Sequence, residues 1–527
     1  MPYVGRVSDR DCKSIHKDGK LSVVLSTTPT LLQPMNNRRY KTPRSRQQAQ
    51  LLPPSLDDYI NEGNHVRAID AYVHSLDLAA MGFLYADGKL TTGQPSYDPA
   101  DLLKLYIYGY TNRIRSSRAL EREAGRNLEV LWLLGELFPS HTTIADFRKH
   151  NSTALIKANK DFVLLCRELS LFGGKTVGID GSFFHGNASK GSIYTEAKLN
   201  RQITALEKDI AAWHEELDAN DQQAQPNNGV ITNDARLADK LEELQNKLVE
   251  KQQQKAQLKA SDEGQLSVTD PDARLLKKRG QSLSGYNVQI AVDAKHKLLA
   301  ASDITNEGND SHQLSAMAKQ VKAALGVDTL NCLADCGYYE SEQLRQCEEE
   351  GVVAYVGIPD SGKRFSNAGR FSRDAFIYDE QQQVYRCPQG ITLTKAERMV
   401  TINNKQYHRF RSTVGDCRHC AMRDQCLSKK GRFREIYRWE HEAVLVRHRE
   451  RMEATPGVMR ERSALAEHPF GTLKRRAGWD HFLVRGIDKV RGEWSLMALC
   501  YNMTRVLNII GMKQFITHCQ EVRSMAI

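Results

Sequence analysis

Apolar residues recur every three or four positions along residues 56–170, the spacing that places them on one face of an α-helix. Prolines and glycines interrupt this pattern, so we predict short helices that form an all-α domain over residues 55–172. The preceding residues 1–54 are mostly polar and basic, and we expect a disordered arm there. Met35 precedes the basic run of this arm, and the sequence leaves open whether the natural chain starts at Met1 or at Met35.

After residue 173 the pattern changes to short apolar runs and alternating positions, which indicate β-strands. Strands are predicted at "TVGIDGSFF" (176–184), twice within 286–305, at "TLNCLAD" (329–335) and at "VVAYVGIP" (352–359). With a helix on each side of "TLNCLAD", this order predicts an α/β domain with a mixed sheet, formed by residues 173–362 and 441–512. Residues 435–452 are expected to be helical, and residues 513–527 to form a C-terminal tail.

Two segments interrupt the α/β pattern. Residues 194–260 carry apolar positions at alternating spacings of four and three on both sides of the polar linker "DANDQQAQPNNG". This pattern predicts an inserted helical hairpin that packs as an antiparallel coiled coil. A dimer arm, a DNA strut and an insertion that packs only on itself are the alternatives. Residues 363–440 are less regular and predict a second insertion with short strands.

The composition narrows the class of protein. The formal net charge is +10, which favours a polyanionic partner such as nucleic acid. The sequence has no run of about 18 apolar residues and no signal peptide, so we expect a soluble, cytoplasmic protein. Eleven cysteines, several of them isolated among apolar residues, suit a reducing compartment.

Two aspartates occupy unusual positions in the predicted sheet. Asp180 lies inside the strand "TVGIDGSFF", and Asp335 ends "TLNCLAD". An unpaired carboxylate in a strand is costly unless a partner or a metal ion neutralises it. The first and fourth strands of such a sheet can be neighbours, which would bring the two carboxylates together. Two acids at strand ends form a cradle for Mg²⁺ or Mn²⁺. Taken singly, each aspartate also fits a strand cap or a turn.

A third carboxylate, Glu467 in "LAEHPFGTLKRRAGW", is our candidate to complete the site. Lys474 follows seven positions later and would share its helix face if the helix is continuous. Pro469 makes this continuity doubtful, because proline fits best in the first turn of a helix. A surface ion pair is the alternative role for Glu467.

A cysteine cluster lies between Asp335 and Glu467. Cys387 is followed by "CRHCAMRDQC", which places the thiols of Cys417, Cys420 and Cys426 close along the chain. Four such residues are typical of a structural Zn²⁺ site, although the spacing departs from the regular paired motif. Zinc ligation and free thiols stay open as alternatives.

Basic residues in the N-terminal helices suggest a DNA-reading surface. Arg118 and Arg148 belong to short helices joined by turns, an arrangement similar to a helix-turn-helix. A plain helical bundle with a solvated basic face is the alternative.

These motifs together resemble one family. The chain resembles a bacterial insertion-sequence transposase of the DDE type, with an InsH-type helical N-terminal domain and an RNase H-like catalytic domain. The resemblance extends from about residue 36 to residue 512 and rests on "LLPPSLDDYI", "SYDPADLLKLYIYGY", "SSRALEREAGRN", "HTTIADFRK", "VGIDGSFFHGNASK", "LADCGYY" and "EHPFGTLKRR".

The resemblance implies a catalytic triad of Asp180, Asp335 and Glu467 that binds two divalent ions, Mg²⁺ or Mn²⁺. It further implies that Lys474, Arg475 and Arg476 contact DNA phosphates, a solvated helix end being the alternative. Trp479 is a candidate to stack on a displaced base, and core packing is its alternative.

The family signature around the glutamate often contains a tyrosine and an arginine that this chain lacks. Arg460 stands at the tyrosine position and Ser463 at the arginine position. Arg462, displaced by one residue, is our candidate to take over the DNA contact of that arginine.

The resemblance implies binding of double-stranded DNA at terminal inverted repeats and at a target, followed by strand cleavage and strand transfer. The enzyme would act as a homodimer or higher oligomer in the bacterial cytoplasm, associated with the nucleoid when bound to DNA. A catalytically silent DNA-binding regulator and a metal-dependent nuclease are the alternative functions.

Overall fold

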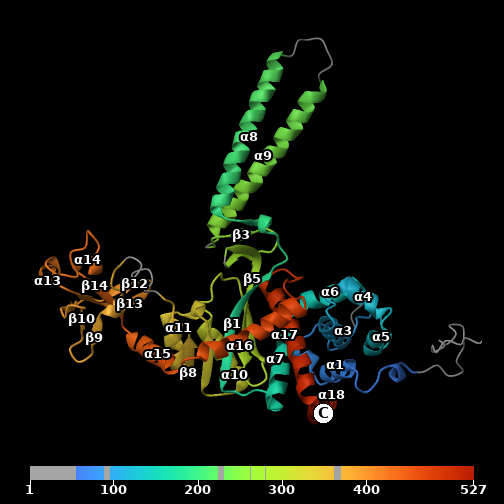
Figure 1. Ribbon diagram of the computed structural model, residues 1–527. Coiled ribbons are helices and arrows are strands. Elements are labelled where there is room, and N and C mark those ends of the chain that lie inside the picture. Colours follow the sequence, from blue (N-terminus) through green and yellow to red (C-terminus); the bar gives the residue numbers. More distant parts are fainter. Residues whose placement is uncertain are drawn as a thin grey trace, which may run out of the picture. The chain divides into compact units, whose positions relative to one another are not determined.

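The computed structural model describes residues 55–87, 95–223, 231–261, 263–278, 280–360 and 369–526 (Figure 1). The predicted basic arm, residues 1–54, lies outside the described residues. In the part of the chain that is described, no helix is long and apolar enough to span a membrane.

Short helices fill the N-terminal region, as the apolar spacing predicts. They are α1 (His65–His74), α2 (Leu78–Met81), α3 (Pro99–Thr111), α4 (Ser117–Ala124), α5 (Leu128–Leu134), α6 (His141–His150) and α7 (Ser152–Glu168). Local signals set their ends: the Asp98 side chain accepts from Ala100 N ahead of α3, and Gly135 ends α5 in the left-handed conformation that favours glycine.

The C-terminal helices complete the core of this region. They are α17 (Ile487–Ile510) and α18 (Met512–Ala526), and α18 packs against α1 and α17. Phe515 and Cys519 of α18 are buried in one hydrophobic core with the N-terminal helices and with β5 and β6 (defined below). The prediction of a C-terminal tail at 513–527 is therefore wrong, and the expected boundary near residue 172 runs through a shared core.

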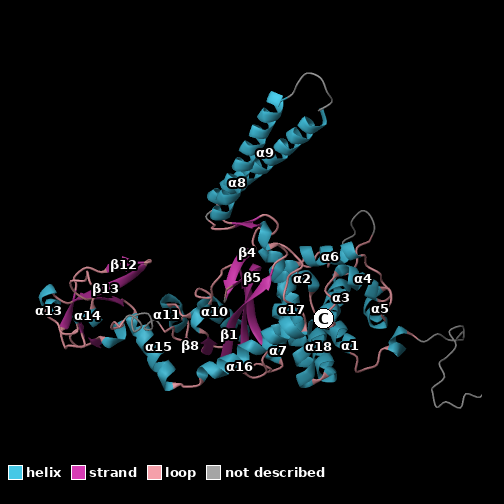
Figure 2. Cartoon of the chain, turned by 45° about the horizontal axis from the view of Figure 1, so that its top comes forward, coloured by secondary structure: helices cyan, strands magenta, loops and turns pink. Residues whose placement is uncertain are grey.

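A mixed sheet forms the centre of the α/β region (Figure 2). Its strands are β1 (Thr176–His185), β4 (Arg274–Lys278), β5 (Gln281–Asp293), β6 (Leu299–Thr305), β7 (Leu330–Ala334) and β8 (Val352–Val356). The order is β4-β5-β1-β7-β8, and β6 pairs with β5. β1 is antiparallel to β5 and parallel to β7. The predicted mixed sheet, with its first and fourth predicted strands as neighbours, is confirmed.

Helices cover both faces of this sheet. They are α10 (Leu314–Leu325), α11 (Ser341–Glu349), α15 (Glu442–Ala454) and α16 (Val458–Gly471). Val177 and Ile179 of β1 are buried in a cluster with residues of α10, whereas α16 packs close to Gly178 on the opposite face. Because successive residues of a strand point to opposite faces, Asp180 points to the same side as Gly178.

Both predicted insertions are present. Helices α8 (Glu196–Gln223) and α9 (Ile231–Ala260) pack along each other as the predicted hairpin, with β2 (Ile193–Tyr194) and β3 (Leu266–Ser267) paired at its base (Figure 1). The second insertion contains β9 (Ile377–Asp379), β10 (Val384–Arg386), β11 (Thr392–Lys395), β12 (Val400–Ile402), β13 (Lys405–Arg411), α13 (Val414–Arg418), α14 (Arg423–Cys426) and β14 (Glu435–Trp439).

The helix expected over residues 435–452 begins later than predicted. Residues Glu435–Trp439 form β14, which pairs with β13, and α15 begins only at Glu442. The pairing buries Ile436 and Trp439, so cross-strand packing overrides the local helical pattern.

His448 of α15 makes stability depend on pH. It is 1% exposed, and its Nε2 accepts a hydrogen bond from Val356 N at 3.2 Å. Burial, followed by the charge of Arg451, lowers the pKa of His448 from its ordinary 6.5 to about 4. The folded state therefore keeps a neutral imidazole while the unfolded chain binds a proton below pH 6.5. The contribution of His448 to stability is complete above pH 6.5 and is lost as the pH falls toward 4.

We expect this loss to reach roughly 2–3 kcal/mol between pH 6.5 and pH 4. Urea unfolding of the wild type and of His448→Gln across this range measures it, because glutamine keeps an acceptor for Val356 N and does not titrate. Equal pH dependence of the two proteins would contradict the assignment.

Candidate active site

Asp180 and Asp335 lie on neighbouring parallel strands at equivalent heights. The parallel register pairs Thr176 with Asn331 and Gly178 with Leu333. Continuing this register by two residues brings Asp180 opposite Asp335, on strands about 4.8 Å apart. Since β7 ends at Ala334 while β1 continues to His185, Asp335 lies where the chain leaves β7 beside the middle of β1.

Each aspartate binds backbone next to it. Asp335 caps a short 3₁₀ turn, and its Oδ1 accepts from Gly337 N at 2.8 Å. Oδ1 of Asp180 accepts from Gly181 N at 2.9 Å. Both carboxylates are partly exposed, so each is held by the chain and still accessible to a ligand.

A third aspartate reaches the same edge from the loop between β6 and α10. Oδ1 of Asp310 accepts from Asn287 Nδ2 and from Gln289 Nε2, both at 2.7 Å. Gln289 in turn accepts a hydrogen bond from the hydroxyl of Tyr338, three residues after Asp335. The loop after β7 and the loop after β6 are thus joined through polar side chains of β5.

The hydroxyl of Tyr338 lies in the field of these carboxylates. Burial raises its pKa well above the ordinary value, and the negative charges of Asp310, Asp180 and Asp335 raise it further. The charge of Arg462 opposes this shift. Three aspartates and one arginine therefore act on a single buried hydroxyl, which stays protonated at neutral pH.

Glu467 lies on α16, the helix that crosses β1. The side chain of Leu465 comes within 3.1 Å of the position that a Cβ on Gly178 would take, so α16 and β1 are in close contact. Glu467 itself is exposed, whereas Leu465 and Ala466 are buried. Among the described residues, no group of three or more His, Cys, Asp or Glu side chains stands close enough together to hold a metal ion. The structure brings together Asp180 and Asp335 and places Glu467 on the adjoining helix.

The helix continues past Glu467 with a change of geometry. Pro469 lies inside α16, and residues Thr472–Arg476 form a π-helical turn. Lys474 Nζ donates to Ser182 Oγ at 2.8 Å and lies 4.3 Å from the ring centre of Phe184. The expectation that Glu467 and Lys474 share one α-helical face is wrong, because the wider π-helical turn directs Lys474 toward β1.

Some of the residues predicted to contact DNA are exposed and others are buried. Arg118, Arg475 and Arg476 are exposed, so they stay predicted contacts. Arg148 (5% exposed) and Trp479 (4% exposed) are buried, and Trp479 packs edge-on against Tyr110. The predicted DNA contact at Arg148 and base stacking at Trp479 are therefore wrong, because both side chains belong to the protein interior.

Arg462 is also buried, with 8% of its surface exposed. The prediction that Arg462 contacts DNA is therefore wrong for a direct surface contact. Its Nε and Nη1 atoms have no hydrogen-bond partner among the described residues. Its charge acts instead on Tyr338, inside the carboxylate site.

Two family models match the chain. Residues 54–150 match one described as a transposase domain (DUF772), and residues 253–503 match one described as a transposase DDE domain. The chain belongs to the DDE transposases of insertion sequences. No curated protein and no solved structure matches it.

The protein is thus a transposase, an enzyme class that cleaves DNA, in a family that generally uses a divalent metal ion such as Mg²⁺. The match to the DDE domain contains Asp335 and Glu467 but begins downstream of Asp180. The assignment of Asp180 to the candidate site is therefore supported only by its position on the strand beside Asp335.

A buried ionic network joins the N-terminal helices of the transposase to α17. Glu493 is fully buried, and its Oε1 lies 3.2 Å from Arg115 Nη2 and 3.5 Å from Arg148 Nη1. Tyr110 donates its hydroxyl to the same oxygen at 2.7 Å. Burial alone raises the pKa of Glu493, but Arg148 and Arg115 hold it below its ordinary value.

The four cysteines of the predicted zinc site line one cavity of about 20 Å³. Cys387, Cys417, Cys420 and Cys426 are free thiols, and Ser412 Oγ lies 3.0 Å from Cys417 Sγ. Burial raises the pKa of Cys426, and Arg434 opposes this shift. The four cysteines share the lining of this cavity, and zinc binding stays a prediction.

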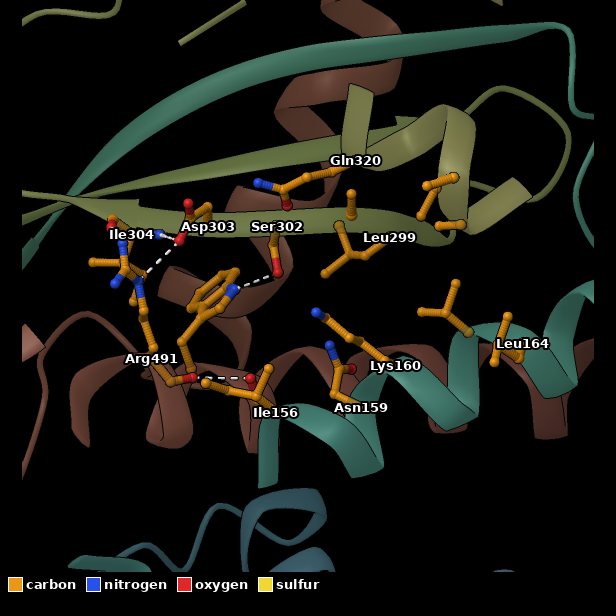
Figure 3. A pocket seen from close by; sticks show the side chains of 17 residues that line it. Ile156, Asn159, Lys160, Leu164, Leu299, Ser302, Asp303, Ile304, Gln320 and Arg491 are labelled. Atoms are coloured by element: carbon orange, nitrogen blue, oxygen red, sulfur yellow. Dashed lines mark hydrogen bonds and ion pairs between the residues drawn. The ribbon is translucent and has the colours of Figure 1, made fainter. Parts of the chain in front are cut away.

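A larger cavity of about 550 Å³ lies between α7, β6, α10 and α17 (Figure 3). Trp494 Nε1 donates to Ser302 Oγ at 2.8 Å, and Arg491 Nε lies 3.0 Å from Asp303 Oδ1. None of the predicted site residues lines this cavity. Its polar contacts join α17 to β6, away from the carboxylates.

Four residues around the carboxylates were not predicted from the sequence: Asp310, Gln289, Asn287 and Tyr338. One signal was available: Asn287 and Gln289 are alternate polar residues in the apolar run of β5, as unexpected there as Asp180 is in β1. Asp310 lies in the polar loop "NEGND", where nothing in the sequence distinguishes it from a surface residue.

Proposed function

We propose that this transposase binds the terminal inverted repeats of its element and performs strand cleavage and strand transfer at Asp180, Asp335 and Glu467. The observation that carries the proposal is the position of Asp180 beside Asp335 on adjacent parallel strands, with α16 crossing β1. The strand order, with β1 between antiparallel β5 and parallel β7, supports an RNase H-like catalytic domain.

The donor atoms fit a hard divalent cation. Asp180 and Asp335 supply carboxylate oxygens, and Asn287 adds a buried Oδ1 that has no hydrogen-bond partner among the described residues. Mg²⁺ and Mn²⁺ prefer such oxygen ligands. Asp180, Asp335 and Glu467 would hold the ions, and bound ions would supply activation of water or of a DNA 3′-hydroxyl and stabilisation of the leaving oxygen. Glu467 would complete the set of oxygen ligands if its exposed side chain turned toward β1.

The residues around the carboxylates fit a DNA substrate. Arg475 and Arg476 are exposed at the end of α16 and are proposed to bind phosphates there. Arg462 brings a buried positive charge to the carboxylate side of α16, and Lys474 fixes the π-helical turn to β1 beyond Asp180. These cations would offset the charge of the phosphate that approaches the aspartates.

Recognition of the DNA ends is assigned to the N-terminal helices, with exposed Arg118 of α4 as a phosphate contact. Because two ends must be joined in one reaction, the active form is proposed to be a dimer or higher oligomer. The hairpin of α8 and α9 is the candidate interface.

Cleavage of a plasmid that carries the ends of the element tests this function. With Mg²⁺ or Mn²⁺ we expect nicking and joined products, and with a chelator neither. Binding of the ends without cleavage would point to a silent regulator. Hydrolysis without joined products would point to a nuclease.

The insertion with the four cysteines is proposed to bind one structural Zn²⁺. Its own hydrophobic core is small, with Phe376, Tyr385, Leu393, Phe410 and Ile436 as its buried members. Four thiol donors around one cavity suit tetrahedral zinc, and a bound ion would stabilise a domain with so small a core.

We expect purified wild-type protein to contain about one zinc per chain. Cys420→Ser and Cys426→Ser should each lose most of it, because a structural site needs all four ligands. Cys336→Ser, which changes an exposed cysteine outside the cavity, is the control. Elemental analysis of the purified proteins measures the content, and a zinc-free wild type would refute the site.

A further inference from the structure

The carboxylate of Asp310 reaches from its own loop to β1. A Cβ on Gly181 would come within 2.5 Å of both Asp310 Oδ1 and Gln289 Nε2, so a larger residue at position 181 would displace one of these side chains. The glycine directly follows Asp180, and the carboxylate fills the space that a side chain would occupy.

The second oxygen of Asp310 lies close to Gly337, in the turn that follows Asp335. The position that a Cβ on Gly337 would take lies 2.9 Å from Asp335 Oδ1 and 3.7 Å from Asp310 Oδ2. Two carboxylate oxygens from different loops thus border one small space at the end of β7. A cation in this space would be attracted by both carboxylates.

Hydrogen bonds fix the orientation of the Asp310 carboxylate. Tyr338 donates to Oε1 of Gln289, so the amide nitrogen of Gln289 must point to Asp310. Asn287 donates to the same Oδ1 of Asp310. With Oδ1 held by two amide groups, Oδ2 is the oxygen that lies near Gly337.

A buried oxygen beside this carboxylate is an independent sign of a ligand. Asn287 is 0% exposed, and its Oδ1 has no hydrogen-bond partner among the described residues, although its Nδ2 binds Asp310. A buried polar atom without a partner is costly, and an amide oxygen is a good ligand for a hard cation or its bound water.

We propose that Asp310 is a fourth carboxylate of the active site and binds the divalent cation through Oδ2 together with Asp335. The proposal rests on the function proposed above and deepens it. Gln289 and Tyr338 act as positioning residues, because they orient Asp310. Asn287 also donates to Asp310, and its Oδ1, which has no hydrogen-bond partner among the described residues, can bind the ion or the water on the ion.

Mn²⁺ binding to the full chain tests this proposal without any DNA. The electron paramagnetic resonance signal of free Mn²⁺ reports the bound fraction for the wild type, Asp310→Asn, Asp335→Asn and Glu307→Gln. Asparagine keeps one oxygen for both amide donors and replaces the other with an NH2 group, which removes the negative charge and the oxygen proposed to bind the ion. Glu307, an exposed carboxylate on the same loop, is the matched control.

We expect Asp310→Asn and Asp335→Asn each to weaken Mn²⁺ binding at least about tenfold, with Glu307→Gln unchanged. If only Asp335→Asn weakens binding, Asp310 is not a ligand. If neither does, the proposed metal site itself fails.

A second readout uses the wild type alone, so it is independent of how the variants fold. Fe²⁺ bound in place of Mg²⁺, with ascorbate and peroxide, cleaves backbone close to the ion. We expect cuts near both Asp335 and Asp310, mapped by mass spectrometry. Cuts near Asp335 without any near Asp310 would overturn the proposal.

Discussion

Glu493→Ala is expected to lower the free energy of unfolding by roughly 3–5 kcal/mol, because it leaves two buried arginines without their counter-ion. Arg115 and Arg148 both contact the same oxygen of Glu493. The other oxygen accepts from Leu483 N and Val484 N at 2.8 and 3.2 Å. One side chain therefore holds together two N-terminal helical segments, α17 and the loop after Trp479.

Urea unfolding of the wild type and the variant measures this loss. Asp488→Ala, on the same helix but with its side chain 87% exposed, is the matched control, and we expect it to change stability by less than about 0.5 kcal/mol. A loss below about 1 kcal/mol for Glu493→Ala would show that the network is not needed for stability.

This network also has a functional consequence. It joins the helices assigned to DNA recognition to the loop that follows Lys474, Arg475 and Arg476. A variant that loosens the network without unfolding the chain should therefore separate DNA binding from cleavage.

Asp180→Asn is expected to reduce DNA cleavage by roughly 10³-fold or more, as the loss of one member of a catalytic unit does. The substitution keeps the size of the side chain and removes the charge that would hold a metal ion. Binding to the terminal repeats should be unchanged, because those contacts are proposed for the N-terminal helices.

Initial cleavage rates on a plasmid with both ends provide the measurement. The double variant with Asp335→Asn should be no slower than either single variant, because the two carboxylates are proposed to serve one site. Asp328→Asn, an exposed aspartate at the opposite end of β7, is the control. Additive losses in the double variant would indicate separate roles for the two aspartates.

The sheet was predictable because its strands are marked by local patterns. Asp180 and Asp335 were predicted because a carboxylate is unusual inside or directly after an apolar strand, and the order of elements indicated that their strands can be neighbours. The parallel pairing of β1 with β7 confirms that these two strands are neighbours.

The failed predictions share one physical cause. Arg148 and Trp479 have partners far away in sequence, so their burial cannot be read from local periodicity. Arg115, which shares the network, pairs with a glutamate 378 residues later. A basic helix face and a buried ionic cluster look the same in sequence until the distant carboxylate is located.

For this protein, the sequence by itself determined most of the helices and strands, two insertions and the family, because each depends on short-range spacing or on motifs of adjacent residues. Only the tertiary structure decided which charges face solvent, that residues 435–439 form β14, that the C-terminal segment completes the N-terminal core, and that Asp310 lies against Gly181 of β1. Those outcomes depend on contacts between distant segments, whose geometry is set by packing and by the cost of burying unpaired polar groups.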